Sequence, residues 1–165
     1  MSSGLRRLTP PQRFMYDYGC FVSFWGNFDL MMEALVWHLR NTDPITNCRE
    51  INTLTSGAKH ERLTELLKDV SPEAMLALHR VFSVAERNDW IHGVVLNPRG
   101  DFSVLTRFRV RKSPLKVENT PIDFGGPFQE FYEAYGLFTE AVDRLLGIDA
   151  RAVCDEYLGA VQRQV

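Results

Sequence analysis

The sequence predicts a mainly α-helical bundle with a small β-hairpin inserted before its last long helix. Two long segments, residues 12–40 and 127–145, carry apolar side chains at steps of three and four, the spacing that forms one face of a helix. Between them, residues 94–111 change to an alternating pattern, which indicates paired strands. The chain has 165 residues, 45% of them hydrophobic, and contains no internal repeats or obvious linkers. We therefore predict a single soluble domain over residues 1–165.

The first predicted helix covers residues 12–40. Thr9-Pro10-Pro11 supplies an N-cap followed by prolines, which the first turn tolerates because no helical N–H is required there. Asn41-Thr42-Asp43-Pro44 ends the helix, since the residue before a proline avoids helical backbone angles. Its buried seam is predicted to consist of Phe14, Tyr18, Phe21, Trp25, Phe28, Met32, Leu35 and Leu39. Together with Tyr16, the aromatic residues of this helix are expected in the core rather than in a base-stacking platform.

Two shorter helical segments are expected next, a weaker one over residues 45–55 and a second that ends near residue 69, with Gly57 interrupting the helical pattern between them. Ser71-Pro72-Glu73 then forms another N-cap with proline at the first helical position. The helix that it opens is predicted to run to about His92, with Gly93 as its C-terminal stop. Its inward face is predicted to carry Met75, Leu78, Phe82 and Ala85.

The predicted hairpin occupies residues 94–111. The apolar run Val94-Val95-Leu96 is followed by the turn-like sequence Asn97-Pro98-Arg99-Gly100. A second strand is then predicted, with Val104, Thr106, Phe108 and Val110 alternating against Leu105, Arg107, Arg109 and Arg111. Residues 112–126 are expected to form an irregular connection, because prolines and glycines interrupt any regular pattern there.

The chain is predicted to end in one long helix and one short helix. Pro127 is expected to begin the long helix, and the short helix follows Gly147-Ile148-Asp149. The face of the long helix that is directed to the core is predicted to carry Phe128, Phe131, Tyr135, Phe138, Val142 and Leu145.

Charge is distributed unevenly along the chain. The net charge of −2 argues against a general nucleic-acid coat protein. Residues 99–117, however, hold six basic residues and one acidic residue, while residues 128–157 hold seven acidic and two basic ones. Arg107, Arg109 and Arg111 alternate along the predicted strand, so they are candidate substrate-binding residues that would follow a phosphate backbone. A protected edge strand with solvated charges explains the same pattern.

Several classes of site are not indicated by the sequence. The three cysteines are widely separated, which is typical of free thiols in a reducing cytoplasm, and no signal peptide or membrane-spanning segment is expected. His38, His60 and His79 lack metal-ligand spacing and are interpreted as surface or packing residues. No glycine-rich phosphate loop, nucleophile elbow or catalytic triad is found, so neither a metal nor another cofactor is predicted.

The segment ERNDWIHG, residues 86–93, places polar side chains where the inward face of its predicted helix would continue. Asn88 and His92 are four residues apart and share a helix face, whereas Arg87 lies about 140° around the helix from His92. An arginine can neutralise phosphate oxygens and a histidine can transfer protons near neutral pH, which is the chemistry of phosphodiester cleavage. Alternatively, the segment is a solvated helix end, in which His92 caps carbonyl groups and Asn88 forms local hydrogen bonds.

This segment resembles the signature of HEPN domains, an arginine followed directly by a polar residue and, four to six positions after the arginine, by a histidine. The resemblance is carried by Arg87-Asn88-Asp89-Trp90-Ile91-His92. It implies a four- to five-helix HEPN-like bundle, with the hairpin at about 94–111 as an elaboration. Many HEPN domains are metal-independent ribonucleases, so the implied catalytic residues are Arg87, Asn88 and His92, acting on RNA without a cofactor.

The resemblance also implies partners. HEPN domains are often homodimers, and a twofold contact would bring Arg87 and His92 of two chains into one cleft. A role in a toxin–antitoxin or defence system, with a cognate antitoxin or regulatory protein as partner, follows from the same resemblance. The alternative is a non-catalytic helical module for dimerisation or protein interaction, in which the motif only holds the helix end or the dimer interface.

Overall fold

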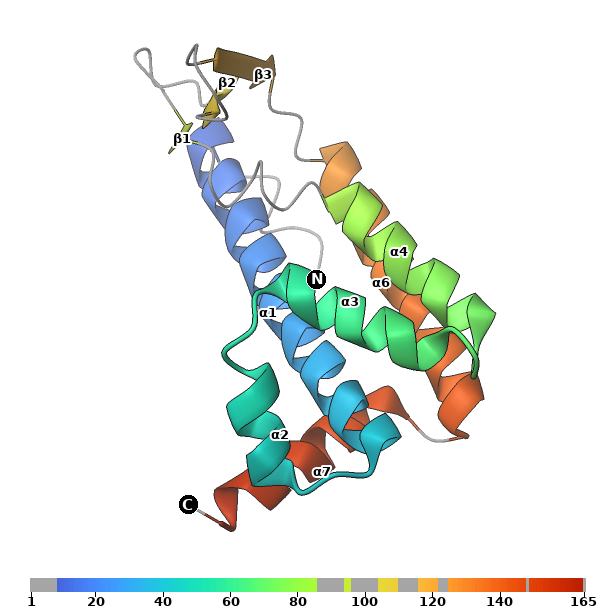
Figure 1. Ribbon diagram of the computed structural model, residues 1–165. Coiled ribbons are helices and arrows are strands. Elements are labelled where there is room, and N and C mark those ends of the chain that lie inside the picture. The colour runs from blue at the N-terminus through green and yellow to red at the C-terminus, as the bar shows by residue number, and fades with distance from the viewer. Residues whose placement is uncertain are drawn as a thin grey trace. The chain divides into compact units, whose positions relative to one another are not determined.

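The computed structural model describes residues 9–85, 94–95, 104–109, 116–121, 125–147 and 149–164. The described part is mainly helical, as predicted (Figure 1). Its six helices are α1 (Pro10–Arg40), α2 (Pro44–Ile51), α3 (Ser56–Leu67), α4 (Pro72–Ala85), α6 (Gly125–Leu146) and α7 (Ala150–Gln162). Its three strands are β1 (Val94–Val95), β2 (Val104–Arg109) and β3 (Lys116–Pro121).

The chain divides into two compact units. Unit 1 comprises Met1–Ser23 and Phe82–Phe131, and unit 2 comprises Phe24–Val81 and Tyr132–Val165. Unit 1 holds the three strands and the first part of α1, and unit 2 holds α2, α3 and α7 together with most of α4 and α6. That residues 1–165 form one domain stays a prediction.

The helices of unit 2 begin at caps that are encoded locally. Asp43 accepts a hydrogen bond from the Thr46 backbone N–H at the start of α2, at 2.8 Å, and Thr55 does the same for Ala58 at the start of α3, at 3.2 Å. Gly57 lies inside α3 as its second residue, so the expected interruption at this position is wrong. The N-cap Thr55 satisfies the first turn there, and a glycine in a first turn does not break a helix that is already capped.

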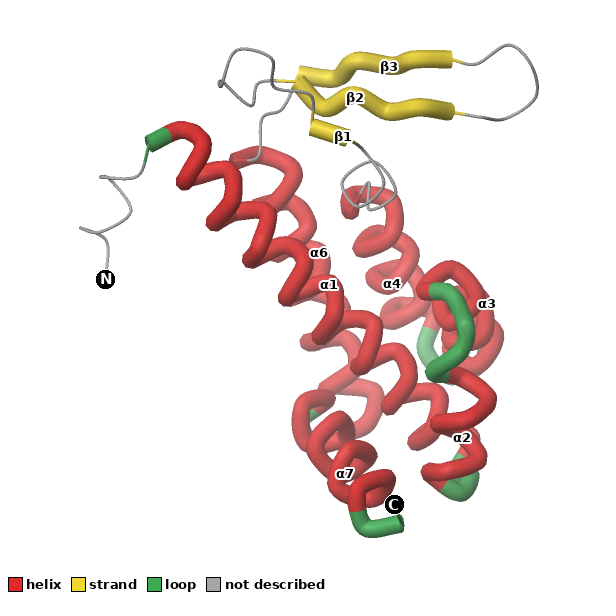
Figure 2. The backbone as a smooth tube through the Cα atoms, turned by 90° about the vertical axis from the view of Figure 1, so that its left-hand side faces the viewer, coloured by secondary structure: helices red, strands yellow, loops and turns green. Residues whose placement is uncertain are grey.

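The core of unit 2 is formed by fully buried side chains from α1, α2, α3, α4, α6 and α7. The rings of Phe28 on α1 and Phe138 on α6 meet edge to face with centroids 5.7 Å apart, and Figure 2 shows α1 running beside α6. This confirms the central part of both predicted seams. The largest fully buried side chains of the described chain are Tyr157, Phe28, Phe131, Phe138, Met32, Leu35, Ile51, Leu63, Leu67, Leu78, Val36 and Val81.

Two predictions of burial are wrong. Tyr16 is 49% exposed, because it lies on α1 outside the seam that runs through Phe21. In α4 the fully buried residues are Ala74, Leu78 and Val81, so the buried face is turned by one residue from the predicted stripe. Of the predicted stripe Leu78 is fully buried, whereas Met75 and Phe82 are only partly buried.

In unit 1 the strands form an antiparallel sheet of order β1-β2-β3. Val94 pairs with Thr106 in the first ladder, within the segment for which the sequence predicts a hairpin. The second ladder runs from Val104 opposite Pro121 to Arg109 opposite Lys116. Strand β3 lies where an irregular connection was expected, so that expectation is wrong over residues 116–121. A strand of this composition is recognised only through its partner, because its own sequence does not alternate between apolar and polar residues.

The other described part of unit 1 consists of helical ends. The rings of Phe21 on α1 and Phe131 on α6 lie edge to face, with centroids 5.3 Å apart. Arg13 and Asp17 form an ion pair of 2.8 Å along α1. Helix α6 begins at Gly125, two residues before the predicted start at Pro127.

Candidate functional site

The motif residues lie next to the end of a described helix. Helix α4 is described as far as Ala85, and Arg87, Asn88 and His92 lie outside the described residues, as does the predicted end of that helix. Of the three arginines predicted to bind substrate, Arg107 and Arg109 lie in strand β2, opposite Glu118 and Lys116 of β3.

Arg111 lies outside the described residues. The roles of Arg107, Arg109 and Arg111 in binding phosphate therefore stay a prediction. The structure gives the strand register at two of these arginines. Arg107 is paired with the acidic Glu118, and Arg109 is paired with the basic Lys116.

Unit 2 contains a buried polar cluster that sequence reasoning did not identify, here called the Glu33 network. Lys59 of α3 contacts two carboxylates of α1, with its Nζ 2.7 Å from Asp29 Oδ2 and 3.1 Å from Glu33 Oε2. The Tyr157 hydroxyl of α7 donates to the other oxygen of Glu33, Oε1, at 2.6 Å. The Asn47 amide of α2 donates to the Glu33 carbonyl at 3.3 Å and to the Tyr157 hydroxyl oxygen at 3.4 Å. Four helices therefore meet at Glu33: its carboxylate joins α1 to α3 and α7, and its backbone carbonyl joins α1 to α2.

The ionisation of the Glu33 network follows from its burial and its partners. Burial alone would lower the pKa of Lys59, but hydrogen bonds and charge from Asp29 and Glu33 outweigh it and raise that pKa. Burial and the hydrogen bond to Glu33 raise the pKa of Tyr157, so its hydroxyl stays protonated and donates. The positive charge of Lys59 and the negative charge of Glu33 compensate each other. Both residues are only 3% exposed, so a substrate has no access to this ion pair. The network therefore holds helices together rather than serving as a reaction centre.

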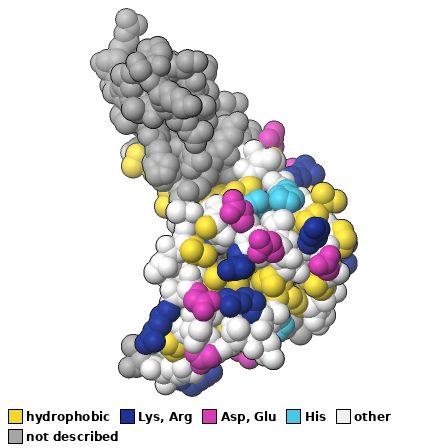
Figure 3. All heavy atoms as spheres, in the orientation of Figure 1, with side chains coloured by type: hydrophobic (Ala, Val, Ile, Leu, Met, Phe, Trp, Pro, Cys, Tyr) yellow, Lys and Arg dark blue, Asp and Glu magenta, His cyan; other side chains and the backbone are white. Residues whose placement is uncertain are grey.

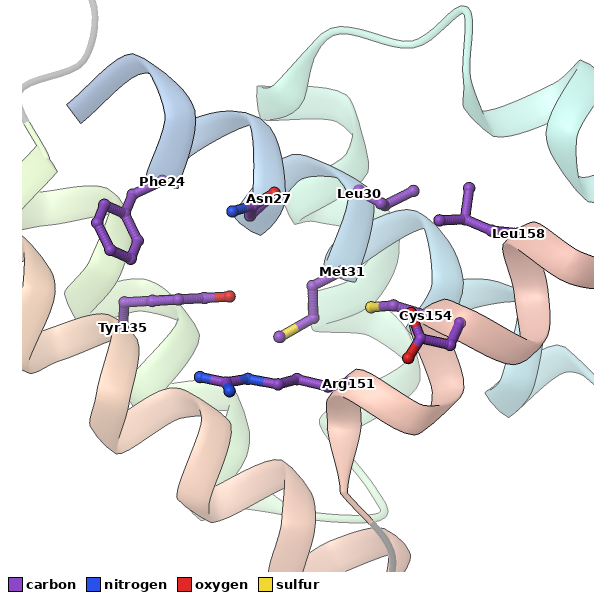
Figure 4. Close-up of a pocket in the computed structure, with 9 residues that line it drawn as sticks. Phe24, Asn27, Leu30, Met31, Tyr135, Arg151, Cys154 and Leu158 are labelled. Atoms are coloured by element: carbon purple, nitrogen blue, oxygen red, sulfur yellow. The ribbon is translucent and has the colours of Figure 1, made fainter. Parts of the chain in front are cut away.

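A cavity of about 380 Å³ opens between α1, α6 and α7 of unit 2 (Figure 4). Its apolar lining is formed by Phe24, Leu30, Met31, Tyr135 and Leu158. Asn27, Arg151, Cys154 and Asp155 add polar groups, and Figure 4 shows the Arg151 side chain extending from α7 toward Tyr135. The lining thus combines apolar walls with one cation and one carboxylate, which suits a small amphipathic group.

The cavity is not built for nucleophilic catalysis by its thiol. Burial raises the pKa of Cys154 to about 11, and the neighbouring charges of Asp155 and Asp149 act in the same direction. Burial also raises the pKa of Tyr135. Both groups are therefore protonated at neutral pH, and the described residues that line the cavity include no histidine or lysine to act as a base.

Two histidines that are distant in sequence meet on the surface of unit 2. The Nε2 atom of His60 on α3 lies 3.0 Å from Nδ1 of His79 on α4. Sequence reasoning assigned both to surface or packing roles because their spacing along the chain is uninformative. Among the residues that the structure describes, no group of three or more histidine, cysteine or acidic side chains could hold a metal ion. No described helix combines the length and apolarity needed to cross a membrane.

Comparisons with known proteins found no relative of this chain. Neither a protein-family model, nor a curated protein, nor a solved structure matches the chain. The resemblance to HEPN domains therefore depends on the sequence alone, above all on Arg87, Asn88 and His92.

Proposed function

We propose that the protein is a metal-independent endoribonuclease of the HEPN type, with Arg87, Asn88 and His92 as its catalytic residues. The observation that carries this proposal is the sequence ERNDWIHG directly after the described end of helix α4. The buried residues of α4, Ala74, Leu78 and Val81, follow steps of four and three. The same steps continue to Ala85, the last described residue of α4, and from there to positions 88 and 92. A continuing helix would therefore present Asn88 and His92 on its inward face.

The proposed chemistry uses the ribose 2′-hydroxyl as the nucleophile. His92 would transfer the proton of that hydroxyl or of the leaving 5′-oxygen, and Arg87 would stabilise the charge that accumulates on the phosphate oxygens. Asn88 would orient His92 or the phosphate. DNA lacks the hydroxyl and should not be cleaved. The resemblance implies products with 2′,3′-cyclic phosphate and 5′-hydroxyl ends.

A symmetric homodimer is part of the same proposal. Arg87 and His92 are about 140° apart around one straight helix, so they could not act on one phosphate within it. Two motif helices meeting near a twofold axis would place the arginine of one chain beside the histidine of the other. Arg107, Arg109 and Arg111 would extend the cleft toward the RNA backbone.

The test is incubation of the purified protein with mixed RNA in the presence of a chelator. His92→Ala and Arg87→Ala should each reduce cleavage by about 100-fold or more, the range for removal of a general acid–base group. His38→Ala and Arg62→Ala serve as matched controls, because His38 lies on α1 and Arg62 on α3 and neither belongs to the motif. If wild type and both motif variants leave RNA equally intact at high enzyme concentration, the nuclease proposal is wrong. Cleavage that survives both substitutions would indicate a contaminant.

The alternative is a non-catalytic dimerisation or protein-interaction module, and one observation favours it. Helix α1 exposes Met15, Tyr16 and Val22 by 58%, 49% and 41%. Met15 and Val22 are seven residues apart and lie on one side of the helix. An apolar strip of this kind suits a partner helix, such as that of a second copy, a cognate antitoxin or a regulatory protein. Sedimentation at micromolar concentration distinguishes a monomer from a dimer, and RNA cleavage distinguishes the two functions.

A further inference from the structure

The contact between His60 and His79 joins two helices of unit 2 at the surface. The Nε2 and Nδ1 atoms are 3.0 Å apart, the ring centroids are 4.8 Å apart, and the ring planes are inclined by 70°. His60 lies in the second turn of α3 and His79 in the middle of α4, so nineteen residues separate them in sequence. Histidine side chains lie on the molecular face seen in Figure 3. Two imidazole nitrogens thus converge from separate, rigid elements.

The distance between these nitrogens suits a metal ion. A first-row transition metal binds imidazole nitrogen at about 2.0–2.1 Å, so two adjacent ligands of a square-planar, octahedral or tetrahedral ion are roughly 2.9–3.4 Å apart. The observed 3.0 Å falls inside this range without any movement of the helices. Rotation of the rings about their side-chain bonds would direct both lone pairs to one apex. Exposure of His79 leaves room for that rotation.

The electrostatic surroundings favour the neutral imidazole that a metal requires. Burial and the proximity of His79 lower the pKa of His60, while the charge of Glu61 opposes this shift. Two positive charges on rings this close would repel each other, so the doubly protonated pair is disfavoured. Glu61 also adds negative charge near an incoming cation.

We propose that His60 and His79 form a binding site for one divalent transition-metal ion, of the copper, nickel and zinc class, which links α3 to α4. Two nitrogen donors select these ions over magnesium and calcium, which prefer oxygen ligands. In the part of the chain that the structure describes, no third histidine, cysteine or carboxylate completes the shell, so water fills the remaining positions. Copper(II) binds most tightly, in keeping with the general order of affinities for divalent ions at nitrogen sites.

The consequence for the protein is a cross-link between two consecutive helices. An ion held by both rings binds the folded state and not the unfolded one, so it stabilises unit 2 in proportion to its concentration. Helix α4 is also the element that leads into residues 86–93, so the ion would restrain the helix directly before that segment. The proposed cleavage of RNA uses no metal, and the metal site therefore stands or fails independently of the nuclease.

The experiment titrates untagged, chelator-stripped protein with Cu²⁺, Ni²⁺ and Zn²⁺ in separate runs, followed by calorimetry and thermal unfolding. We expect one equivalent of Cu²⁺ per chain, a Tm that rises with metal concentration, and an electron paramagnetic resonance spectrum of Cu²⁺ with two nitrogen ligands. His60→Gln and His79→Gln should each weaken binding by more than about tenfold, because one of two nitrogen donors is lost. The matched control is His38→Gln, since His38 lies on α1 and should leave the affinity unchanged.

The circular dichroism and Tm of each metal-free variant show that the substitution leaves the fold intact. His79 is exposed, so His79→Gln tests the site even if the partly buried His60 proves necessary for folding. Unchanged Cu²⁺ affinity in His79→Gln would overturn the proposal, as would the absence of binding by wild type. Several weak equivalents that no histidine substitution alters would identify adventitious surface binding and would equally refute it.

Discussion

Replacing Lys59 with methionine tests the Glu33 network most directly. The substitution removes the cation that lies 2.7 Å from Asp29 and 3.1 Å from Glu33 but keeps an apolar side chain of similar length. The side chain of Glu33 is only 4% exposed and cannot regain water, whereas Asp29, at 26%, can do so in part. Breaking a buried ion pair on one side usually costs about 3–5 kcal/mol, because the remaining charge is left uncompensated. We expect a loss in this range.

Urea unfolding at pH 7 measures this loss, and thermal unfolding should show a fall of roughly 6–20 °C in Tm, at about 2–4 °C per kcal/mol for a chain of this size. Because the pKa of Lys59 is raised in the folded state, the stabilisation by its charge is complete below 10.5, the ordinary value for lysine, and is lost only at higher pH. The whole effect is therefore present at pH 7. Lys68→Met is the matched control, since Lys68 is exposed, and should change stability by less than about 0.5 kcal/mol.

The Lys59→Met variant should also acquire a new dependence on pH. Its buried Glu33 carboxylate would have lost its cation, so the charged form of that carboxylate should be disfavoured in the folded variant. The folded variant would then bind more protons than the unfolded chain, and its deficit relative to wild type should shrink as the pH falls below neutrality. Adding Glu33→Gln should recover part of the loss at pH 7. A neutral or stabilising effect of Lys59→Met alone would refute the view that this charge pair is interdependent.

Two further predictions follow from shifted pKa values. Burial and His79 lower the pKa of His60, so as the pH falls the unfolded chain takes up a proton at this residue before the folded protein does. The free energy of unfolding should therefore decrease below about pH 6.5, the ordinary pKa of histidine. In urea unfolding, His60→Gln should reduce this dependence on pH, and an unchanged dependence would show that His60 does not cause it. With a pKa of about 11, Cys154 is a thiolate in only about one molecule in a thousand at pH 8. In a variant that also carries Cys20→Ser and Cys48→Ser, the rate of alkylation of Cys154 should rise about tenfold per pH unit up to pH 10. A plateau of that rate near pH 8.5 would show that the pKa of the thiol is not raised.

The sequence by itself determined the helical class and most helix limits, because these depend on neighbours a few residues apart. The seam through Phe28, Met32 and Leu35 is visible from the period of the apolar residues, and these side chains are buried as predicted. The start of α2 is likewise local, since Asp43 caps the first turn and Pro44 follows it. The motif at Arg87 and His92 is also a property of the sequence alone, and its function stays a prediction.

Only the tertiary structure decided which distant residues meet. Asp29 and Glu33 are visible in the sequence as acidic residues one turn apart on an apolar helix, which signals a polar site, but nothing local indicates Lys59 as their partner. The contact from Tyr157 to Glu33 spans 124 positions, and that between His60 and His79 spans nineteen. Strand β3 was missed for the same reason, because its hydrogen bonds are made with β2 and not within itself. The period of the apolar residues identifies which face of a helix or strand is buried. Tertiary packing determines which other element covers that face, and therefore which side chains come together to form a site.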